Sequence, residues 1–222
     1  MPRTVTHFAL TALIALLLGG CATEQHRALE TPQVKAAATN YQGPRALVAI
    51  GKLDNRSSFM RGIFTDGVDR LGSQAKTILI GHLQESGRFS VLERENLEES
   101  KQEAGFKGQA QSIKGADFLI AGAVAEFGRK EVGDQQLFGL LGRGKEQVAY
   151  AKVTLNAVST QTSEVVFSAS GAGEYKLSTR EVVGFGGTAG YDATLNGKVL
   201  DLAIREAVDK LAQAVQSGAL RK

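Results

Sequence analysis

The hydrophobic pattern of the chain alternates between short apolar runs and helical stripes. Residues 45–53 are apolar on both alternate sets at their centre, which predicts a central strand buried on both faces. Apolar residues then recur at helical spacing over 66–85, with Asp66 as the candidate N-cap. A short strand at 89–92, a charged helix at 93–103 and a buried strand at 117–124 follow.

The last stretch with a sustained period predicts a long helix over 194–217. Its apolar residues form one stripe: Leu200, Ala203, Ile204, Ala207, Val208, Leu211 and Val215. This helix should cover one face of the sheet. The predicted elements follow in the order strand, helix, strand, helix, strand, further strands and a final helix. This order predicts a compact mixed-sheet α/β sandwich.

Residues 165–193 alternate with period two over an unusual length. One face is apolar and the other is small, polar or charged, and a polar tip at 179–181 separates two limbs. A transmembrane β-strand needs this alternation over about 9–11 residues, so the apolar face is a candidate membrane-facing surface: Phe167, Ala169, Tyr175, Phe185 and Tyr191. A long soluble hairpin lying over the sheet has the same alternation, and both interpretations stay open.

A second candidate hairpin spans about 127–155. Its first limb carries three consecutive charged residues at 129–131, whereas its return limb alternates well. Two hairpins cannot span a bilayer alone, because each unpaired backbone group in hydrocarbon costs several kcal/mol. Only a ring of chains could close their edges into an oligomeric transmembrane β-barrel, with hairpin one of one chain beside hairpin two of the next.

The N-terminus has the features of a secretory signal peptide over residues 1–20. Arg3 precedes an apolar run at 8–18 that is too short to span a membrane. Leu-Gly-Gly-Cys at 18–21 resembles a bacterial lipoprotein cleavage site, which implies a lipid on Cys21. The alternative is an ordinary secreted protein with a free cysteine. Residue 22 is Ala rather than Asp, and under the sorting rule that this resembles, such a lipoprotein goes to the outer membrane.

Residues 21–43 are polar and aperiodic, so we expect a lipidated N-terminus with a flexible linker before a single domain at 44–222. The formal net charge of +3 is spread along the chain and gives no nucleic-acid footprint. The 26 glycines among 222 residues exceed the usual share of about 7%. Many of them lie in the two predicted hairpins, where they need an explanation.

Candidate chemistry is sparse. The one cysteine is assigned to lipid, the three histidines lie far apart, and we find no nucleophile and base pattern, phosphate loop or carboxylate pair in a convincing context. His82 falls on the apolar stripe of its helix and is expected at the core or its edge. We therefore expect no enzyme, no metal site and no cofactor apart from the covalent lipid on Cys21.

Several segments together resemble the curli secretion channel family (CsgG/HfaB) over roughly 44–216. They are Phe-Ser-Val-Leu-Glu-Arg at 89–94 before a charged helix, Gly-Ala-Asp-Phe-Leu-Ile-Ala-Gly at 115–122, the segments 137–139, 153–158 and 163–166, and the terminal helix. The resemblance implies an outer-membrane lipoprotein that faces the periplasm. It also implies a ring homo-oligomer to which each copy contributes two hairpins.

The resemblance further implies a part in the assembly or export of an extracellular fibre or adhesin. Secreted fibre subunits and accessory lipoproteins would then be partners, besides membrane lipid and other copies of the chain. A pore constriction would lie on the loop after the first strand, where Asn55, Phe59 and Phe64 are the candidates. The alternative function is a periplasmic lipoprotein without a pore that docks on, or regulates, a partner in the cell envelope.

Overall fold

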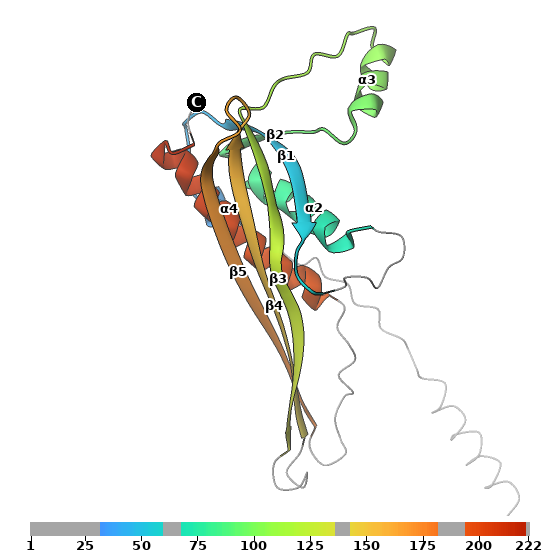
Figure 1. Ribbon diagram of the computed structural model, residues 1–222, viewed down its shortest axis with the longest axis vertical. Coiled ribbons are helices and arrows are strands. Elements are labelled where there is room, and N and C mark those ends of the chain that lie inside the picture. The colour runs from blue at the N-terminus through green and yellow to red at the C-terminus, as the bar shows by residue number, and fades with distance from the viewer. Residues whose placement is uncertain (1–31, 60–67, 136–142, 182–193, 221–222) are drawn as a thin grey trace, which may run out of the picture. The chain divides into compact units, whose positions relative to one another are not determined.

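A computed structural model describes residues 32–59, 68–135, 143–181 and 194–220, without the side chains of 131–135, 143–145 and 178–181 (Figure 1). Contacts divide the chain into Met1–Pro32 and Gln33–Lys222. The elements of the second unit, in chain order, are η1 (Lys35–Ala38), β1 (Ala46–Asn55), α2 (Arg70–Glu85), β2 (Phe89–Leu92), α3 (Leu97–Phe106), β3 (Phe118–Gln135), β4 (Arg143–Ser159), β5 (Val165–Glu181) and α4 (Leu195–Ser217).

The strands form one mixed sheet in the order β2-β1-β3-β4-β5. β2, β1 and β3 are parallel, whereas β3, β4 and β5 form an antiparallel ladder. The helices α2 and α4 lie side by side on one face of the sheet (Figure 1). This two-layer arrangement confirms the predicted mixed-sheet α/β sandwich.

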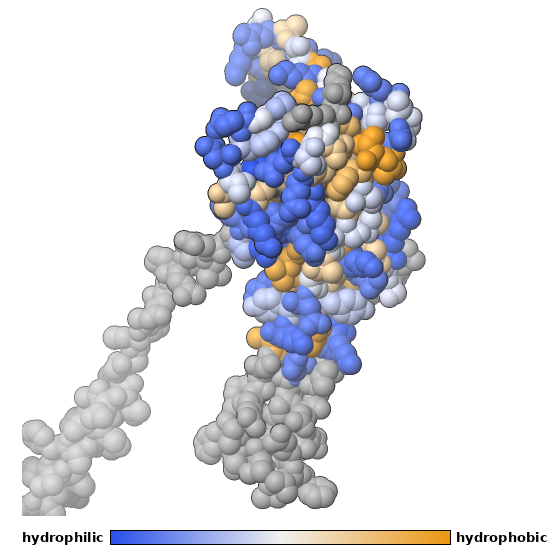
Figure 2. Space-filling view, turned by 90° about the vertical axis from the view of Figure 1, so that its left-hand side faces the viewer, coloured by the Kyte–Doolittle hydropathy of each residue, from blue (hydrophilic) through white to orange (hydrophobic). Residues whose placement is uncertain are grey.

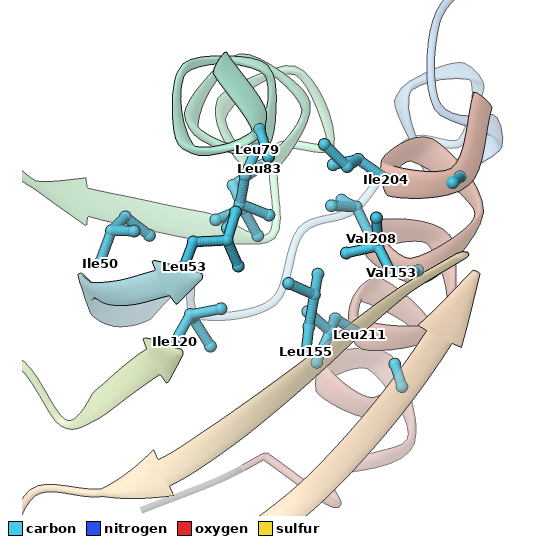
Figure 3. Close-up of a cluster of buried hydrophobic side chains, with 14 of the residues drawn as sticks. Ile50, Leu53, Leu79, Leu83, Ile120, Val153, Leu155, Ile204, Val208 and Leu211 are labelled. Carbon is cyan, nitrogen blue, oxygen red and sulfur yellow. The ribbon is translucent and has the colours of Figure 1, made fainter. Parts of the chain in front are cut away.

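The core lies between the sheet and the two helices. Leu79 and Leu83 of α2 and Ile204 and Leu211 of α4 point toward the strands, where Leu155 of β4 meets them (Figure 3). All five side chains are 0% exposed. The apolar stripe predicted on the last helix is thus its core face, and helix burial of this kind supplies most of the stability of an α/β layer.

The start of α2 differs from the prediction. The helix begins at Arg70, and its N-cap is Asp69, whose carboxylate accepts the Gly72 N–H at 2.8 Å. The other carboxylate oxygen of Asp69 accepts the Asn55 N–H at 2.6 Å. The predicted cap, Asp66, lies outside the described residues. Asp69 is favoured because it satisfies a backbone donor at the end of β1 as well as the helix.

The two predicted hairpins have different outcomes. The hairpin at 127–155 is part of a longer one, in which β3 and β4 pair from Phe118↔Ser159 to Gln135↔Arg143. The predicted tip at 179–181 is wrong, because these residues belong to β5 and pair with Arg143–Lys145 of β4. Antiparallel pairing with a neighbouring strand takes precedence over a local turn signal there. The predicted return limb lies outside the described residues.

The linker predicted at 21–43 is shorter in the structure, since its last part packs on the domain. Val34 is 1% exposed within the core, and the Ala36 N–H donates to Asp209 of α4 at 3.1 Å. The guanidinium of Arg88, itself 2% exposed, donates to the Thr39 carbonyl and lies 4.9 Å from the centre of the Tyr41 ring. One buried apolar side chain, two hydrogen bonds and one cation–π contact thus hold this short segment against the domain.

Candidate assembly site

The three long strands extend past the helix layer. We define their projecting end as Lys130–Gln135 of β3, Arg143–Val148 of β4 and Lys176–Glu181 of β5, which remain paired in unbroken register. Figure 1 shows this end continuing beyond the start of α4. A row is a set of directly paired residues across β3, β4 and β5. We call the rows on the other side of this boundary, where α4 covers one face of the strands, the helix-backed rows.

The projecting end has one outer strand edge on β3 and another on β5. Within the described part of the chain, no further strand pairs with either edge. β1 ends where Asn55 pairs with Val124, and one further bond joins the Arg56 N–H to the Val124 carbonyl at 2.9 Å. From Glu126 onward β3 has β4 as its described neighbour on one side only. β5 is the last strand in the sheet order, so its outer edge is the opposite border. β4 is paired on both sides and offers no edge to another molecule.

The apolar face of β5 meets α4, a contact that the sequence did not predict. Ala169 is 3% exposed, and Phe167 and Tyr175 pack against the hydrophobic core. These three residues were candidates for a membrane-facing surface, with a soluble hairpin lying over the sheet as the open alternative. The helix α4 covers them instead, because its own apolar stripe can be buried only against an apolar surface of similar length. Phe185 and Tyr191 lie outside the described residues.

Two glycines explain how α4 comes so close to β5. A Cβ on Gly171 would lie 2.0 Å from the Ala203 carbonyl oxygen, and one on Gly173 would lie 2.8 Å from that of Val199. Either distance is shorter than van der Waals contact allows, so any side chain here would push the helix backbone away. Part of the glycine excess is therefore accounted for by helix packing.

The side of the domain formed by α4 and β5 is mainly polar at its surface. Figure 2 shows many hydrophilic residues on this side, with a hydrophobic patch at the upper right and further hydrophobic residues where the domain narrows toward the projecting end. On the open face of these strands, Lys152 and Glu126 form an ion pair at 3.5 Å, and Lys176 and Glu174 another at 3.2 Å. Exposed pairs of this kind contribute about 0–1 kcal/mol each, so their main effect is on solubility.

The candidate constriction residues lie at the end of β1. The Asn55 side-chain amide donates to the Phe59 carbonyl at 2.8 Å, and its oxygen accepts from Ser57 at 2.6 Å. The Phe59 ring is tilted against Phe127 of β3, with centroids 4.7 Å apart. The structure thus brings Asn55, the last residue of β1, together with Phe59 of the following loop, which packs on the sheet. Phe64 lies outside the described residues.

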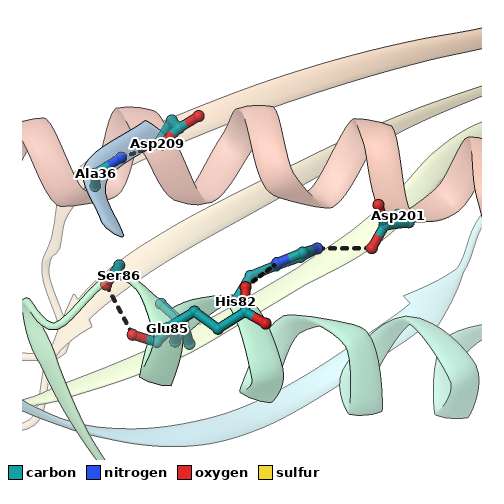
Figure 4. Close-up of polar contacts among 7 residues, drawn as sticks. Ala36, His82, Glu85, Ser86, Asp201 and Asp209 are labelled. Atoms are coloured by element: carbon teal, nitrogen blue, oxygen red, sulfur yellow. Dashed lines mark hydrogen bonds and ion pairs between the residues drawn. The ribbon is translucent and has the colours of Figure 1, made fainter. Parts of the chain in front are cut away.

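A polar cluster, in which His82 is buried and its two acidic partners are partly exposed, joins α2 and α4 (Figure 4). His82 of α2 is 5% exposed, with its Nε2 atom 2.8 Å from Asp201 of α4 and its Nδ1 atom 3.1 Å from Glu85. Burial lowers the pKa of His82, but the hydrogen bonds and charges of Asp201 and Glu85 outweigh it, so the pKa is raised above its ordinary value. The cluster therefore favours an imidazolium held between two carboxylates.

The sequence pointed to His82 but not to its partners. Asp201 is polar and lies off the apolar stripe of α4, which is the usual sign of a solvent-facing residue. Its role comes only from its contact with His82, 119 positions earlier in the chain. Arg88 and Asp209 were missed for the same reason. In the described part of the chain, no group of three or more His, Cys, Asp or Glu residues is arranged to hold a metal ion.

Comparisons with known proteins agree with the resemblance in the sequence. The family model described as "Curli production assembly/transport component CsgG" matches residues 30–221. A relative from Neisseria meningitidis serogroup B, "Putative lipoprotein NMB1126/NMB1164", is 61% identical over 217 residues, which are 98% of this chain and 97% of the relative.

The solved structures that resemble this chain are more distant. The hypothetical protein CT253 from Chlamydia trachomatis is 13% identical with a TM-score of 0.42, and the match covers 78% of this chain and 99% of that one. Lipoprotein GNA1162 from Neisseria meningitidis is 14% identical with a TM-score of 0.31, covering 79% and 99%. The PelC dodecamer from Paraburkholderia phytofirmans is 15% identical with a TM-score of 0.33, covering 82% and 93%. These likenesses concern the fold alone.

Proposed function

The chain belongs to the family of the curli production assembly/transport component CsgG, and from this premise we propose that it is an outer-membrane lipoprotein whose copies form a ring. The ring would take part in the assembly or export of an extracellular fibre or adhesin. Its partners would be membrane lipid, other copies of the chain, secreted fibre subunits and accessory lipoproteins. The anchored domain would face the periplasm.

The projecting end is the observation that carries this proposal. Its three strands keep their pairing beyond the helix layer, with one strand edge on each side in the described part of the chain. A small ladder of this kind gains little stability by itself, and strand edges are sites where another chain adds. Pairing between copies would satisfy both edges at once, and a heterologous contact that closes by rotation produces a ring.

The lipid anchor is supported by the cleavage-site pattern before Cys21 and by the description of the Neisseria relative as a "putative lipoprotein". Among the described residues, no helix has the length and apolar character needed to cross a bilayer. We expect Cys21→Ser to release the protein from the outer-membrane fraction, because a serine oxygen cannot form the thioether. Membrane fractionation measures this. Unchanged retention would mean that the cysteine is not the anchor.

Disulfide crosslinking tests the ring. Lys130 of β3 and Lys176 of β5 are exposed and lie in one row of the ladder, on either side of Val148. They are two strand spacings apart, about 9.6 Å, which is too far for a disulfide within one chain. Oxidation of Lys130→Cys/Lys176→Cys should therefore give ladders between copies that end at one closed species. Neighbouring positions, Gly128 and Glu174, allow for a shift in register.

The matched control is Val148→Cys/Lys176→Cys, whose positions are direct partners within the chain. It should give an internal disulfide and no ladder. Detergent extracts separated by size and imaged for rings provide a second measurement. A protein that stays monomeric, with no crosslink between copies at any position, would contradict the ring and favour a periplasmic lipoprotein that docks on an envelope partner.

A further inference from the structure

The outer edge of β5 is partly occupied by side chains of α4. In an antiparallel strand, the backbone groups of every second residue point away from the paired neighbour. On β5 these include the Ser170 carbonyl and the Ala172 N–H, because both bind side chains from α4 rather than β4. The edge of the sheet is therefore not uniform along the strand.

Two residues of α4 make these contacts, and we refer to Glu206 and Lys210 as the edge lock. The Glu206 carboxylate accepts the Ala172 N–H at 2.8 Å, and the Lys210 ammonium donates to the Ser170 carbonyl at 2.6 Å. The two side chains also form an ion pair at 2.8 Å. The Ala172 N–H, followed by Lys210, holds the pKa of Glu206 below its ordinary value, so the carboxylate is charged at neutral pH.

The lock reproduces the hydrogen bonds that an incoming strand would make. A strand adding at this point needs the Ser170 carbonyl as an acceptor and the Ala172 N–H as a donor, and both are already satisfied. It would also have to displace two side chains whose outer parts are about half exposed, at 47% and 46%. Occupying edge groups in this way is a known means of blocking strand addition.

The edge lock on β5 lies at the same level of the sheet as the point where β1 stops pairing with β3. Glu126, Lys152 and Ala172 lie in one row across β3, β4 and β5. On the β3 side, pairing with β1 ends at Val124, just before this row. Both borders of the ladder are thus occupied above the same row, and both are accessible below it within the described residues.

We propose that Glu206 and Lys210 act as specificity residues for assembly, which block strand addition on the helix-backed part of β5 and confine pairing with a second copy to the strands below Ala172. This inference rests on the proposed ring. The second copy is the occupant that the geometry favours, because β3 carries a matching border, beginning at Glu126, with which no strand in the described part of the chain pairs. Each copy therefore supplies both halves of one interface at one level.

Hydrogen exchange tests the contact itself, whether or not a ring forms. In Glu206→Ala/Lys210→Ala, the Ala172 amide should exchange at least about tenfold faster, since it loses a charge-assisted acceptor. Glu206→Gln keeps an oxygen that can accept, so it should retain part of the protection. Gln213→Ala, an exposed change on the same helix, is the matched control and should change nothing. An unchanged Ala172 rate in the double variant would overturn the lock.

The effect on assembly is measured separately. Ser168 is exposed on the locked part of β5, and its backbone groups point to the same border as those of Ser170. With Ser168→Cys added, the double variant should form disulfide dimers through paired β5 edges, whereas the same cysteine in the intact chain should form few. Faster exchange without new dimers would overturn the specificity role. New dimers from a chain that forms no ring would support the block and contradict the proposed function.

Discussion

The helix-backed rows and the projecting end belong to the same three strands, yet they differ in what surrounds them. In the helix-backed rows the side chains of β4 that face α4 are almost completely buried: Ala149 0%, Ala151 2%, Val153 0%, Leu155 0% and Ala157 0%. Below them the strands remain paired but extend past the helix. Backbone pairing is thus continuous along the strands, whereas the hydrophobic contribution to stability is concentrated in the helix-backed rows.

This difference shows how little a period-two pattern reveals about its surroundings. Alternation fixes which residues share a face of a strand, because successive side chains point to opposite sides. It does not say whether a helix, a lipid or a second copy covers that face. The same apolar set on β5 was compatible with a membrane and is found against α4 at Ala169.

The largest effect we expect comes from comparing two glycines within the helix-backed rows, one on the face that α4 covers and one on the open face. Gly171→Ala places a methyl group against the backbone of α4, at 2.0 Å from the Ala203 oxygen, and should lower the free energy of unfolding by about 1–3 kcal/mol or more. Gly128→Ala also creates a short contact, 2.5 Å, but with the ring of Tyr150, which is 43% exposed and free to rotate. Its cost should stay within about 0.5 kcal/mol.

Denaturant unfolding monitored by circular dichroism measures both variants. Equal losses would mean that the close approach of α4 to β5 is not what makes the covered face of the strands sensitive to an added methyl group. A large loss for Gly128→Ala alone would place the rigid packing on the open face of the strands instead of the face that α4 covers.

Elements with a strong signal of their own were predicted closely. β2 has the predicted bounds, and α4 begins one residue later than expected, at Leu195. Their signals are local, since apolar spacing alone gives the period and length of a helix, and turn residues delimit a short strand. The hairpin formed by β3 and β4 was likewise visible in the alternation of its return limb.

Features that depend on distant parts of the chain were not predictable in this way. Val34 lies in a segment without a period, so only the finished surface around α4 shows that it is buried. The pairing of β5 with β4 joins two limbs that the sequence pattern assigned to different hairpins. The partners of His82 and the contacts of Glu206 join helices and strands that are far apart in sequence.

Phe59 offers a second, smaller test, because it decides whether the loop after β1 belongs to the packed part of the molecule. Its ring contacts Phe127, which is 3% exposed in the helix-backed rows. Phe59→Ala should lower the free energy of unfolding by about 1–3 kcal/mol, less than the ~3–5 kcal/mol of a fully buried phenylalanine, since Phe59 is only partly buried. Phe106→Ala, at a ring that is 73% exposed, is the matched control and should cost under about 0.5 kcal/mol.

The same variant bears on the proposed constriction. If Phe59 lines a pore, its truncation should raise single-channel conductance in planar bilayers without changing ring assembly. A loss of stability with unchanged conductance would instead assign the residue to packing alone. Phe64→Ala gives the corresponding measurement at the other candidate phenylalanine.

The smallest effect concerns the link that holds α4 beside α2, and hence the cover over the helix-backed rows. Asp201 and Glu85 raise the pKa of His82 in the folded protein above its ordinary value. A raised pKa stabilises the fold fully below the unfolded pKa of about 6.5, and this contribution is lost as the pH rises through the folded pKa.

Asp201→Asn removes one of the two charges, so it should lower the pKa of His82 in an NMR titration. Asp209→Asn, the same change on the same helix without contact to His82, should leave it unchanged. The destabilisation caused by Asp201→Asn should also be larger near pH 5.5 than near pH 8.5. A destabilisation that grew with pH would show that His82 is held neutral. The two helices would then be joined by packing rather than by charge.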